Sequence, residues 1–192
     1  MKLIIASGNR HKVREIREIL GGAFEEILSM TEAGIDHETV EDGATFLENA
    51  RKKAREIVEL SGCAAIADDS GLCVEALGGA PGILSARYCG CHGEDEENNR
   101  LLLRNMEGVS DRRAHYTCAA VIAYPDGTTV EAQGYMHGTL LTEGRGTGGF
   151  GYDPLFVPTG GERTLAEYTP EEKNAISHRA AALAALLEAL KK

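Results

Sequence analysis

Two adjacent aspartates after an apolar run constrain this chain more than any other feature of its sequence. The run Cys63–Ile66 is small and apolar, which is typical of a short buried strand. It leads into Ala67–Leu72, which contains Asp68, Asp69, a serine and a glycine. These residue types favour a turn, so we expect the strand to end here, where open α/β sheets bind ligands. A plain turn is the simplest interpretation of this hexapeptide taken alone.

The two aspartates are expected to do different jobs. On a regular strand successive side chains point to opposite faces, so Asp68 and Asp69 would not share one partner. One of them could hold a divalent cation or take a proton from water, while the other could fix the loop.

Length and composition place the chain among ordinary globular proteins. Its 192 residues suit one domain or two closely joined lobes, and no apolar run reaches the ~20 residues of a membrane-spanning helix. The start, Met1–Ala6, is too short for a signal peptide and is interpreted as a first strand. The five cysteines include no CxxC pair, which favours reduced thiols and a cytoplasmic location. Cys89, Cys91 and His92 hint at a metal, but a zinc site needs a fourth ligand.

The formal charge of −10 argues against nucleic acid as a partner, because a polyanion would be repelled over most of the surface. If the ligand is itself anionic, a local cluster of cations or a metal ion must meet it.

Periodicity and capping signals predict an alternation of strands and helices. The expected elements are a strand over 2–6, a helix over 11–20, a strand over 24–30, a capped helix from Thr45 to Gly62, a helix over 94–107, a hairpin over 114–124 and 128–137, a strand over 155–157, and one helix from Thr169 to about Leu190. In that last helix Ile176, Leu183 and Leu186 are expected to be buried. Lys173 and His178 would lie about 140° apart on it, at ~100° per residue.

The turn Ser7–Asn9 links the first strand to the first helix, a layout in which free N–H groups can cradle phosphate. Arg10, His11 and Lys12 follow in the first helical turn. Their charges oppose the helix dipole unless an anion binds. A solvated basic turn is the alternative.

Two loops have open interpretations. The acidic loop Asp36–Gly43 could be merely solvated, or it could present a carboxylate to the same metal as Asp69. Gly144–Gly151 carries five glycines in eight residues. It could pack under a flat ligand, with Phe150 or Tyr152 against the ligand's face, or it could be a flexible surface loop.

Six segments, taken together and in order, resemble the inosine triphosphate pyrophosphatase family, whose members include the bacterial, Ham1-like XTP/dITP diphosphatases. The segments are Ser7–Lys12, Thr45–Ala50, Asp68–Leu72, Gly78–Gly82, Gly148–Pro154 and Glu172–Arg179. Each is weak alone, but six in the family's order and spacing over nearly the whole chain are highly specific.

The resemblance implies an α/β fold of a single domain over 1–192: an elongated, two-lobed fold around a mixed, highly twisted sheet flanked by helices, with the active site in the cleft between the lobes. It also implies Mg²⁺-dependent hydrolysis of ITP, dITP and XTP to the nucleoside monophosphate and pyrophosphate, which removes deaminated purines from the nucleotide pool. A homodimer is implied as well, with no nucleic-acid or membrane partner.

The resemblance also assigns residues. Asp69 would be the catalytic base and a metal contact, with Glu41 as the second metal ligand and Glu38 as its rival. The substrate contacts would be Ser7, Gly8, Asn9, Arg10, His11, Lys12, Ser70, Phe150, Gly151, Tyr152, Asp153, Lys173, His178 and Arg179.

The chemistry of the residues agrees with this assignment. Cleavage between the α and β phosphates needs cations on the leaving pyrophosphate, which Arg10, Lys12 and Lys173 could supply beside Mg²⁺. His178, Arg179 and N–H groups near Gly151 could donate to a 6-keto purine and so disfavour adenine. Two alternatives are a Maf-like pyrophosphatase for pyrimidine or modified nucleotides and a nucleotide-binding module without turnover.

Overall fold

Six strands form one mixed sheet in the computed structural model, which describes residues 2–191. The strands are β1 (Lys2–Ile5), β2 (Glu26–Ser29), β3 (Ala64–Val74), β4 (Arg113–Ala123), β5 (Thr129–Leu140) and β6 (Phe156–Pro158), in the order β2-β1-β3-β4-β5-β6. β1 pairs in parallel with β2 and β3, whereas β5 and β6 are antiparallel.

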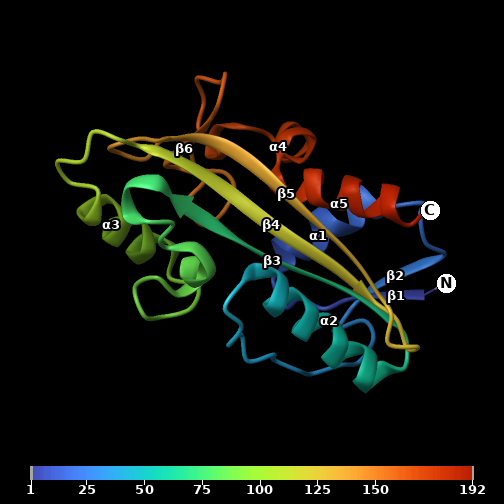
Figure 1. The fold of residues 1–192 in the computed structure, drawn as a ribbon. Helices are drawn as coiled ribbons and strands as arrows, with labels where there is room; N and C mark the ends of the chain where they lie inside the picture. The colour runs from blue at the N-terminus through green and yellow to red at the C-terminus, as the bar shows by residue number, and fades with distance from the viewer. Residues whose placement is uncertain (1, 192) are drawn as a thin grey trace. The chain divides into compact units, whose positions relative to one another are not determined.

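Five α-helices accompany these strands: α1 (Arg10–Leu20), α2 (Phe46–Ser61), α3 (Asp95–Asn105), α4 (Pro170–Ile176) and α5 (His178–Ala189). Short 3₁₀ helices cover Glu75–Leu77 (η1), Gly82–Arg87 (η2) and Leu165–Glu167 (η3). The predicted α/β class, the mixed sheet and the β4–β5 hairpin are confirmed (Figure 1).

The chain divides into two units, each with its own core. Unit 1 comprises Met1–Asp69, Cys118–Gly134 and Arg179–Lys192, and unit 2 comprises Ser70–Thr117 and Tyr135–His178. β3, β4 and β5 each contribute residues to both units. The expected elongated shape and cleft between lobes stay predictions.

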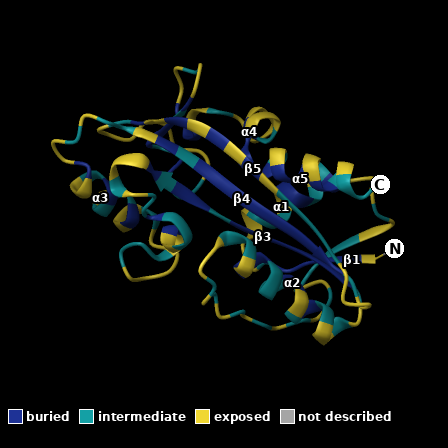
Figure 2. Ribbon diagram, in the orientation of Figure 1, coloured by how far each residue is buried: buried dark blue, intermediate teal, exposed yellow. Residues whose placement is uncertain are grey.

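In unit 1 the sheet has a separate apolar core on each face. One core joins Leu3, Ile5 and Ile66 of the strands to Ile16 of α1 and Leu183 of α5. The other joins the alternate residues Ile4, Ala65 and Ala67 to Ala54 and Ile57 of α2. Figures 1 and 2 show α2 on one side of the buried strands and α1 and α5 on the other. The period-2 alternation of strand side chains therefore decides which helix each strand residue meets.

Unit 2 has a third core, built on one side of its strand segments. It contains Leu72 and Val74 of β3, Tyr116 of β4 and Phe156 of β6. Along β5 buried and exposed residues alternate from Gln133 to Leu140, which Figure 2 shows as alternating colours.

Two expectations about element boundaries are wrong. β3 does not end at Ala67 but continues through both aspartates to Val74. Helices on each face supply partners for the two carboxylates, so tertiary contacts override the turn preference of Asp, Ser and Gly.

The expected C-terminal helix is two helices, separated at Ser177, whose backbone is extended (φ −70°, ψ 154°). An unbroken helix would set Lys173 and His178 about 140° apart. With the break, both are buried, whereas Ile176, expected in the core, is 43% exposed.

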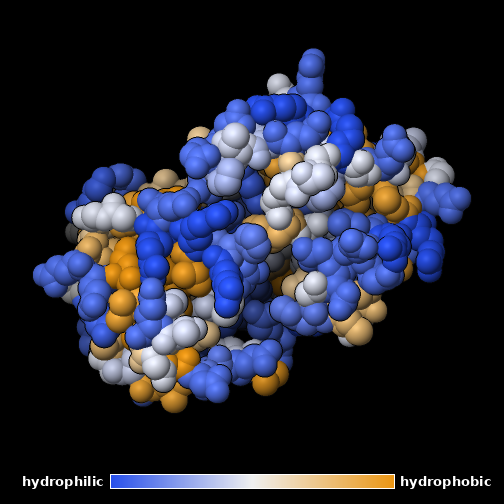
Figure 3. All heavy atoms as spheres, turned by 180° about the vertical axis from the view of Figure 1, so that it is seen from behind, coloured by the Kyte–Doolittle hydropathy of each residue, from blue (hydrophilic) through white to orange (hydrophobic). Residues whose placement is uncertain are grey.

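No helix within residues 2–191 is long and apolar enough to cross a membrane. Hydrophilic residues cover most of the face seen in Figure 3, with hydrophobic residues in separate patches. All five cysteines are free, and Cys118 is fully buried. Residues 2–191 contain no group of three metal-ligating side chains placed to hold an ion, so Cys89, Cys91 and His92 do not form one.

We expect Thr45→Ala to lower the free energy of unfolding by about 1 kcal/mol. The Thr45 hydroxyl accepts a hydrogen bond from the Glu48 N–H at the start of α2, and alanine would leave that donor without its cap. Urea unfolding measures the change. Thr31→Ala, at an exposed threonine outside every helix and strand, is the matched control and should change stability little. Equal stability of the two variants would contradict this role of the cap.

Candidate functional site

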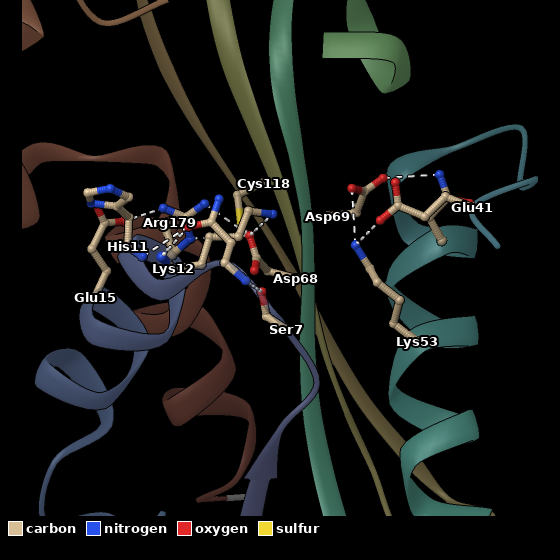
Figure 4. A network of polar contacts seen from close by, with 12 residues as sticks. Ser7, His11, Lys12, Glu15, Glu41, Lys53, Asp68, Asp69, Cys118 and Arg179 are labelled. Carbon is tan, nitrogen blue, oxygen red and sulfur yellow. Dashed lines mark hydrogen bonds and ion pairs between the residues drawn. The ribbon is translucent and has the colours of Figure 1, made fainter. Parts of the chain in front are cut away.

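Asp68 and Asp69 lie on opposite faces of β3, as the alternation of strand side chains predicts. Figure 4 shows Asp68 with Lys12 and Arg179 on the side of α1 and α5, and Asp69 with Glu41 and Lys53 on the side of α2. Neighbouring residues on one strand thus contact entirely different partners. All of these residues belong to unit 1.

Two residues of α2 hold the Asp69 carboxylate. Asn49 Nδ2 donates to Asp69 Oδ2 at 3.1 Å, and Lys53 Nζ lies 3.3 Å from Asp69 Oδ1. Asn49 and Lys53 are four residues apart, so they project from the same face of the helix. Asn49 also accepts a hydrogen bond from the Gly43 N–H at 2.8 Å, which fixes the end of the acidic loop.

The acidic loop brings a second carboxylate to the same lysine. Glu41 Oε1 lies 2.7 Å from Lys53 Nζ, so Glu41 and Asp69 converge on one partly buried cation. Glu38, the rival metal ligand from the sequence, is exposed. The loop is therefore more than a solvated run of charge.

The environment shifts the protonation of these groups. Burial raises the pKa of the Asp69 carboxyl, and the charge of Glu41 adds to the rise. Lys53, Lys12 and the Asn49 hydrogen bond oppose it without cancelling it. Burial alone would lower the pKa of Lys53, but Asp69 and Glu41 raise it. Asp69 therefore binds a proton more tightly than an ordinary aspartate does.

This arrangement fits a magnesium ion. Carboxylate oxygens are the ligands that Mg²⁺ prefers, usually one or two from the protein, with waters and phosphate oxygens completing the shell. Asp69 and Glu41 supply two such carboxylates, and the ammonium of Lys53 beside both shows that the pair attracts a cation. The donor set therefore suits the metal expected from the sequence.

On the opposite face Asp68 is surrounded by cations. Its Oδ2 lies 3.1 Å from Lys12 Nζ and 3.1 Å from Arg179 Nη2, and Arg179 also pairs with Glu15. Burial would raise the pKa of Asp68, but Arg179, Lys12 and Lys53 outweigh it and hold that pKa well below its usual range. Asp68 is therefore ionised at any ordinary pH, unlike a group that exchanges protons.

The loop before α1 is organised by Asn9. The Asn9 side chain is the N-cap of α1 and accepts hydrogen bonds from the N–H groups of His11 and Lys12. Gly8, Arg10 and His11 are exposed, so the basic turn is open to a ligand. Asn9 itself also donates its N–H to Ser7 Oγ at 3.2 Å.

A cavity of about 820 Å³ adjoins this loop in unit 1. Ser7, Gly8 and Arg10 line one part of it, and the rest is lined by further residues of α1, by Gly21 and by Ser29, Thr31 and Glu32. Asp69 does not line it.

In unit 2 a buried carboxylate organises a second group of expected site residues. Lys173 Nζ lies 2.6 Å from Asp153 Oδ2, and the Phe150 N–H donates to the same oxygen at 2.9 Å. The Lys173 ammonium also lies 4.2 Å from the centre of the Phe150 ring. Asp153 thus fixes both the lysine and the aromatic ring, and a cation over a ring face is a favourable contact.

The other expected residues of unit 2 differ in how far they are buried. The His178 ring stacks on Tyr116, with 4.7 Å between centroids and 12° between planes. Tyr152 is buried and its hydroxyl donates to the Ser85 carbonyl, whereas Phe150 is partly exposed. Of the two rings expected against a flat ligand, Phe150 is the one whose surface is accessible. Ser70 is partly buried on β3.

The glycine-rich loop is closely packed rather than loose. A Cβ on Gly149, whose φ is +71°, would lie 2.1 Å from Asp153 Oδ2, and one on Gly146 would lie 2.6 Å from the Ala166 backbone. The Gly151 N–H, expected to donate to the purine base of the nucleotide, instead donates to Asp95 Oδ2 at 2.7 Å. Glycine is thus required here for close approach of the backbone.

The structure therefore gathers the expected residues into three groups. Asp69 and Glu41 meet on the α2 face, Lys12 and Arg179 meet at Asp68, and Phe150, Asp153 and Lys173 meet within unit 2.

Sequence reasoning missed Lys53, Glu15 and Tyr116. The i, i+4 spacing of Asn49 and Lys53 was a usable signal for the first of these. Glu15 and Tyr116 gave no such signal.

Fold and site together define an α/β protein with a basic loop after its first strand and a pair of carboxylates, one buried and one partly buried, suited to a divalent cation. The Ham1 family model matches residues 3–189. This chain belongs to the Ham1 family.

Curated relatives and solved structures match over nearly the full length. The chain is 47% identical to the dITP/XTP pyrophosphatase of Streptomyces coelicolor, covering 97% of this chain and 95% of the relative. It is 48% identical to the dITP/XTP pyrophosphatase of Clostridium perfringens, covering 99% and 97%. The structure of the Staphylococcus aureus Ham1 protein superposes with a TM-score of 0.89 at 36% identity, covering 100% of this chain and 98% of that one. The dITP/XTP pyrophosphatase from Mycobacterium abscessus gives a TM-score of 0.79 at 46% identity, covering 97% and 99%.

Asp69→Asn is expected to raise the free energy of unfolding at pH 7 by on the order of 1 kcal/mol. Folding raises the pKa of Asp69, so its stabilising contribution is complete below the unfolded pKa and is lost as pH rises through the folded pKa. The asparagine cannot ionise and avoids that loss. Urea unfolding in EDTA at several pH values measures the difference, which should shrink as the pH falls toward the ordinary value of 3.8.

Asp42→Asn is the matched control. Its carboxylate accepts a hydrogen bond from Lys52, which lowers its pKa, so this substitution should not stabilise the protein. Stabilisation by both substitutions, or by neither, would contradict the assignment of Asp69.

Proposed function

We propose that this protein hydrolyses the non-canonical purine nucleotides dITP, ITP and XTP to the nucleoside monophosphate and pyrophosphate. The observation that carries the proposal is full-length identity of 47% and 48% to relatives named dITP/XTP pyrophosphatase. The paired carboxylates of Asp69 and Glu41 support it, because pyrophosphate release needs both an activated water and a neutralised leaving group.

Asp69 is the proposed base. A carboxylate that takes a proton from water works best when its pKa is raised toward the working pH, and burial raises that of Asp69. The hydrogen bond from Asn49 fixes the orientation of its carboxylate. This assignment rests on geometry and on the family resemblance.

Asp69 and Glu41 are also the proposed holders of Mg²⁺. When bound, the ion would neutralise charge on the leaving pyrophosphate. Lys53, which lies against both carboxylates, would add its positive charge beside them.

The other expected residues are proposed to bind the substrate. The loop Ser7–Lys12 would hold phosphates, with the exposed Arg10 and the partly buried Lys12 as its cations. Ser70, Phe150–Asp153, Lys173 and His178 would bind base, sugar and phosphate, with the accessible Phe150 ring against the base. Arg179, also expected to contact the substrate, is 1% exposed and its guanidinium pairs with Asp68 and Glu15, so its proposed part is to hold these two carboxylates.

Selectivity would come from the 6-keto oxygen that hypoxanthine and xanthine carry in place of the adenine amino group. A site that presents donors there would leave them unpaired with ATP, and such mismatches can give discrimination of ~10⁴ or more. His178 is the proposed donor of unit 2, and its ring is held by the stack on Tyr116.

A homodimer and a cytoplasmic location are part of the same proposal. The family resemblance supports the dimer, and light scattering tests it. The five free cysteines support a reducing compartment.

A panel of nucleoside triphosphates assayed for pyrophosphate release with Mg²⁺ tests the function. We expect dITP, ITP and XTP to be cleaved at least ~10³-fold more efficiently than ATP, by the mismatch argument above. Asp69→Asn should lower kcat by about 10²-fold or more with dITP, because the base is lost.

Release of orthophosphate instead of pyrophosphate, or a preference for pyrimidine nucleotides, would contradict the proposal. Binding of dITP with no turnover would favour a nucleotide-binding module.

The metal assignment is tested by Glu41→Gln, with Glu38→Gln as the matched control in the same loop. Only Glu41 contacts the Lys53–Asp69 group, so Glu41→Gln should raise the Mg²⁺ concentration needed for half-maximal activity by about 10-fold or more. Glu38, which is exposed, should tolerate the change. A larger increase in the required Mg²⁺ concentration for Glu38→Gln than for Glu41→Gln would identify Glu38 as the second metal ligand.

A further inference from the structure

A buried cluster of four charged side chains lies on the α1 and α5 face of β3. Its members are Lys12 and Glu15 of α1, Asp68 of β3 and Arg179 of α5, all in unit 1. Their formal charges sum to zero. The Asp68 side chain is 0% exposed, those of Arg179 and Glu15 are 1% and 7% exposed, and that of Lys12 is 16% exposed.

Within this cluster the two acids have different partners. Asp68 Oδ2 accepts hydrogen bonds from Arg179 Nε at 3.2 Å and Nη2 at 3.1 Å, and Glu15 contacts Arg179 Nη1. Both acids therefore neutralise the buried guanidinium. Asp68 alone of the two forms the ion pair with Lys12, at 3.1 Å.

The ion pair with Asp68 holds Lys12 in place beside the basic loop. Lys12 is a cation of the basic loop whose partner Asp68 is fully buried, and its side chain is the least buried of the four in the cluster. Asp68 is fully covered, so it fixes the ammonium without presenting its own negative charge to an anionic ligand. A long, flexible lysine side chain held in advance loses less freedom when phosphate binds.

We propose that Asp68 is a positioning residue, which holds the Lys12 ammonium from the rigid strand β3 so that it is pre-set for the phosphates of the substrate. The proposal deepens the proposed function and rests on it. It assigns the two neighbouring aspartates separate roles: Asp69 serves the reaction on the α2 face, and Asp68 sets a phosphate-binding cation on the other.

Glu15→Gln is the matched control for Asp68→Asn. Each substitution removes one acid from Arg179 and replaces a carboxylate with an amide of nearly the same shape. A role confined to neutralising Arg179 would affect both variants and would leave the environment of Lys12 unchanged in each. A role in placing Lys12 separates them, because Asp68 carries the contact with Lys12.

Steady-state kinetics with dITP and Mg²⁺ give the first readout. Asp68→Asn should lower kcat/KM by about 10- to 100-fold, chiefly through KM, the scale of a misplaced binding group. In Glu15→Gln, kcat/KM should stay within about threefold of the value for the unmodified protein. A tenfold change would correspond to about 1.4 kcal/mol, so this effect is smaller than that. Equal losses in the two variants overturn the proposal.

Acetylation of Lys12, followed by mass spectrometry at fixed pH without nucleotide, gives a readout independent of activity. Losing its buried partner should make Lys12 react several-fold faster in Asp68→Asn, with the exposed Lys2 and Lys191 as internal references. In Glu15→Gln the rate should not change. An unchanged rate in Asp68→Asn overturns the proposal.

A double-mutant cycle with Lys12→Ala isolates the coupling between the two residues. If Asp68 acts through Lys12, Asp68→Asn should have little further effect on KM in the Lys12→Ala background. Additive effects overturn the proposal.

Two further controls keep the outcomes separate. If Asp68→Asn does not fold, Asp68→Glu and Glu15→Asp replace the first pair of variants. Both keep the charge and move the carboxylate by one methylene. Equal effects of these two substitutions again overturn the proposal. If the unmodified protein cleaves no nucleotide, the proposed function fails, while the acetylation rates still test the placement of Lys12.

Discussion

The alternation of side chains along β3 is the constraint on which the site depends. Because successive residues of a strand face opposite ways, Asp68 and Asp69 cannot enter the same environment. One faces the helices α1 and α5, and the other faces α2. The strand thereby delivers two carboxylates, one to each face of the sheet, at a single point along its length.

The two environments drive the protonation of the carboxylates in opposite directions. Asp68 is fully buried, yet Arg179 and Lys12 hold it ionised. Asp69 is less tightly paired, and burial raises its pKa. Groups whose pKa values are pushed apart commonly have separate roles in a site, one electrostatic and one in proton transfer. Here the separation follows from which helix packs on which face.

Burying so many charges is costly unless each has a partner. The protein meets this condition by pairing across elements: α1 and α5 neutralise Asp68, and α2 with the acidic loop surrounds Asp69. In unit 2 Asp153 plays a similar part for Lys173. The break in the C-terminal helix at Ser177 has a related effect. It allows polar residues on both sides of the break, such as Lys173 and His178, to be buried.

Local signals in the sequence were enough for most of the fold. The helix N-cap at Thr45, the hairpin turn at residues 125–127 and the apolar periodicity of α1 each depend on near neighbours, and each is confirmed. The glycine-rich loop was open between two interpretations, and the close contact of Gly149 with Asp153 shows why glycine stands there. Such contacts join residues that only the folded chain brings together.

The sequence by itself determined the residue types, the opposite faces of Asp68 and Asp69, and the family to which the six segments point. The partners of the two aspartates were decided only by the tertiary structure. Lys53 and Arg179 reach them across 16 and 111 residues of chain, and no local periodicity encodes such distances. Local order follows from short-range sterics and hydrogen bonding, whereas partner choice follows from how helices pack on a sheet.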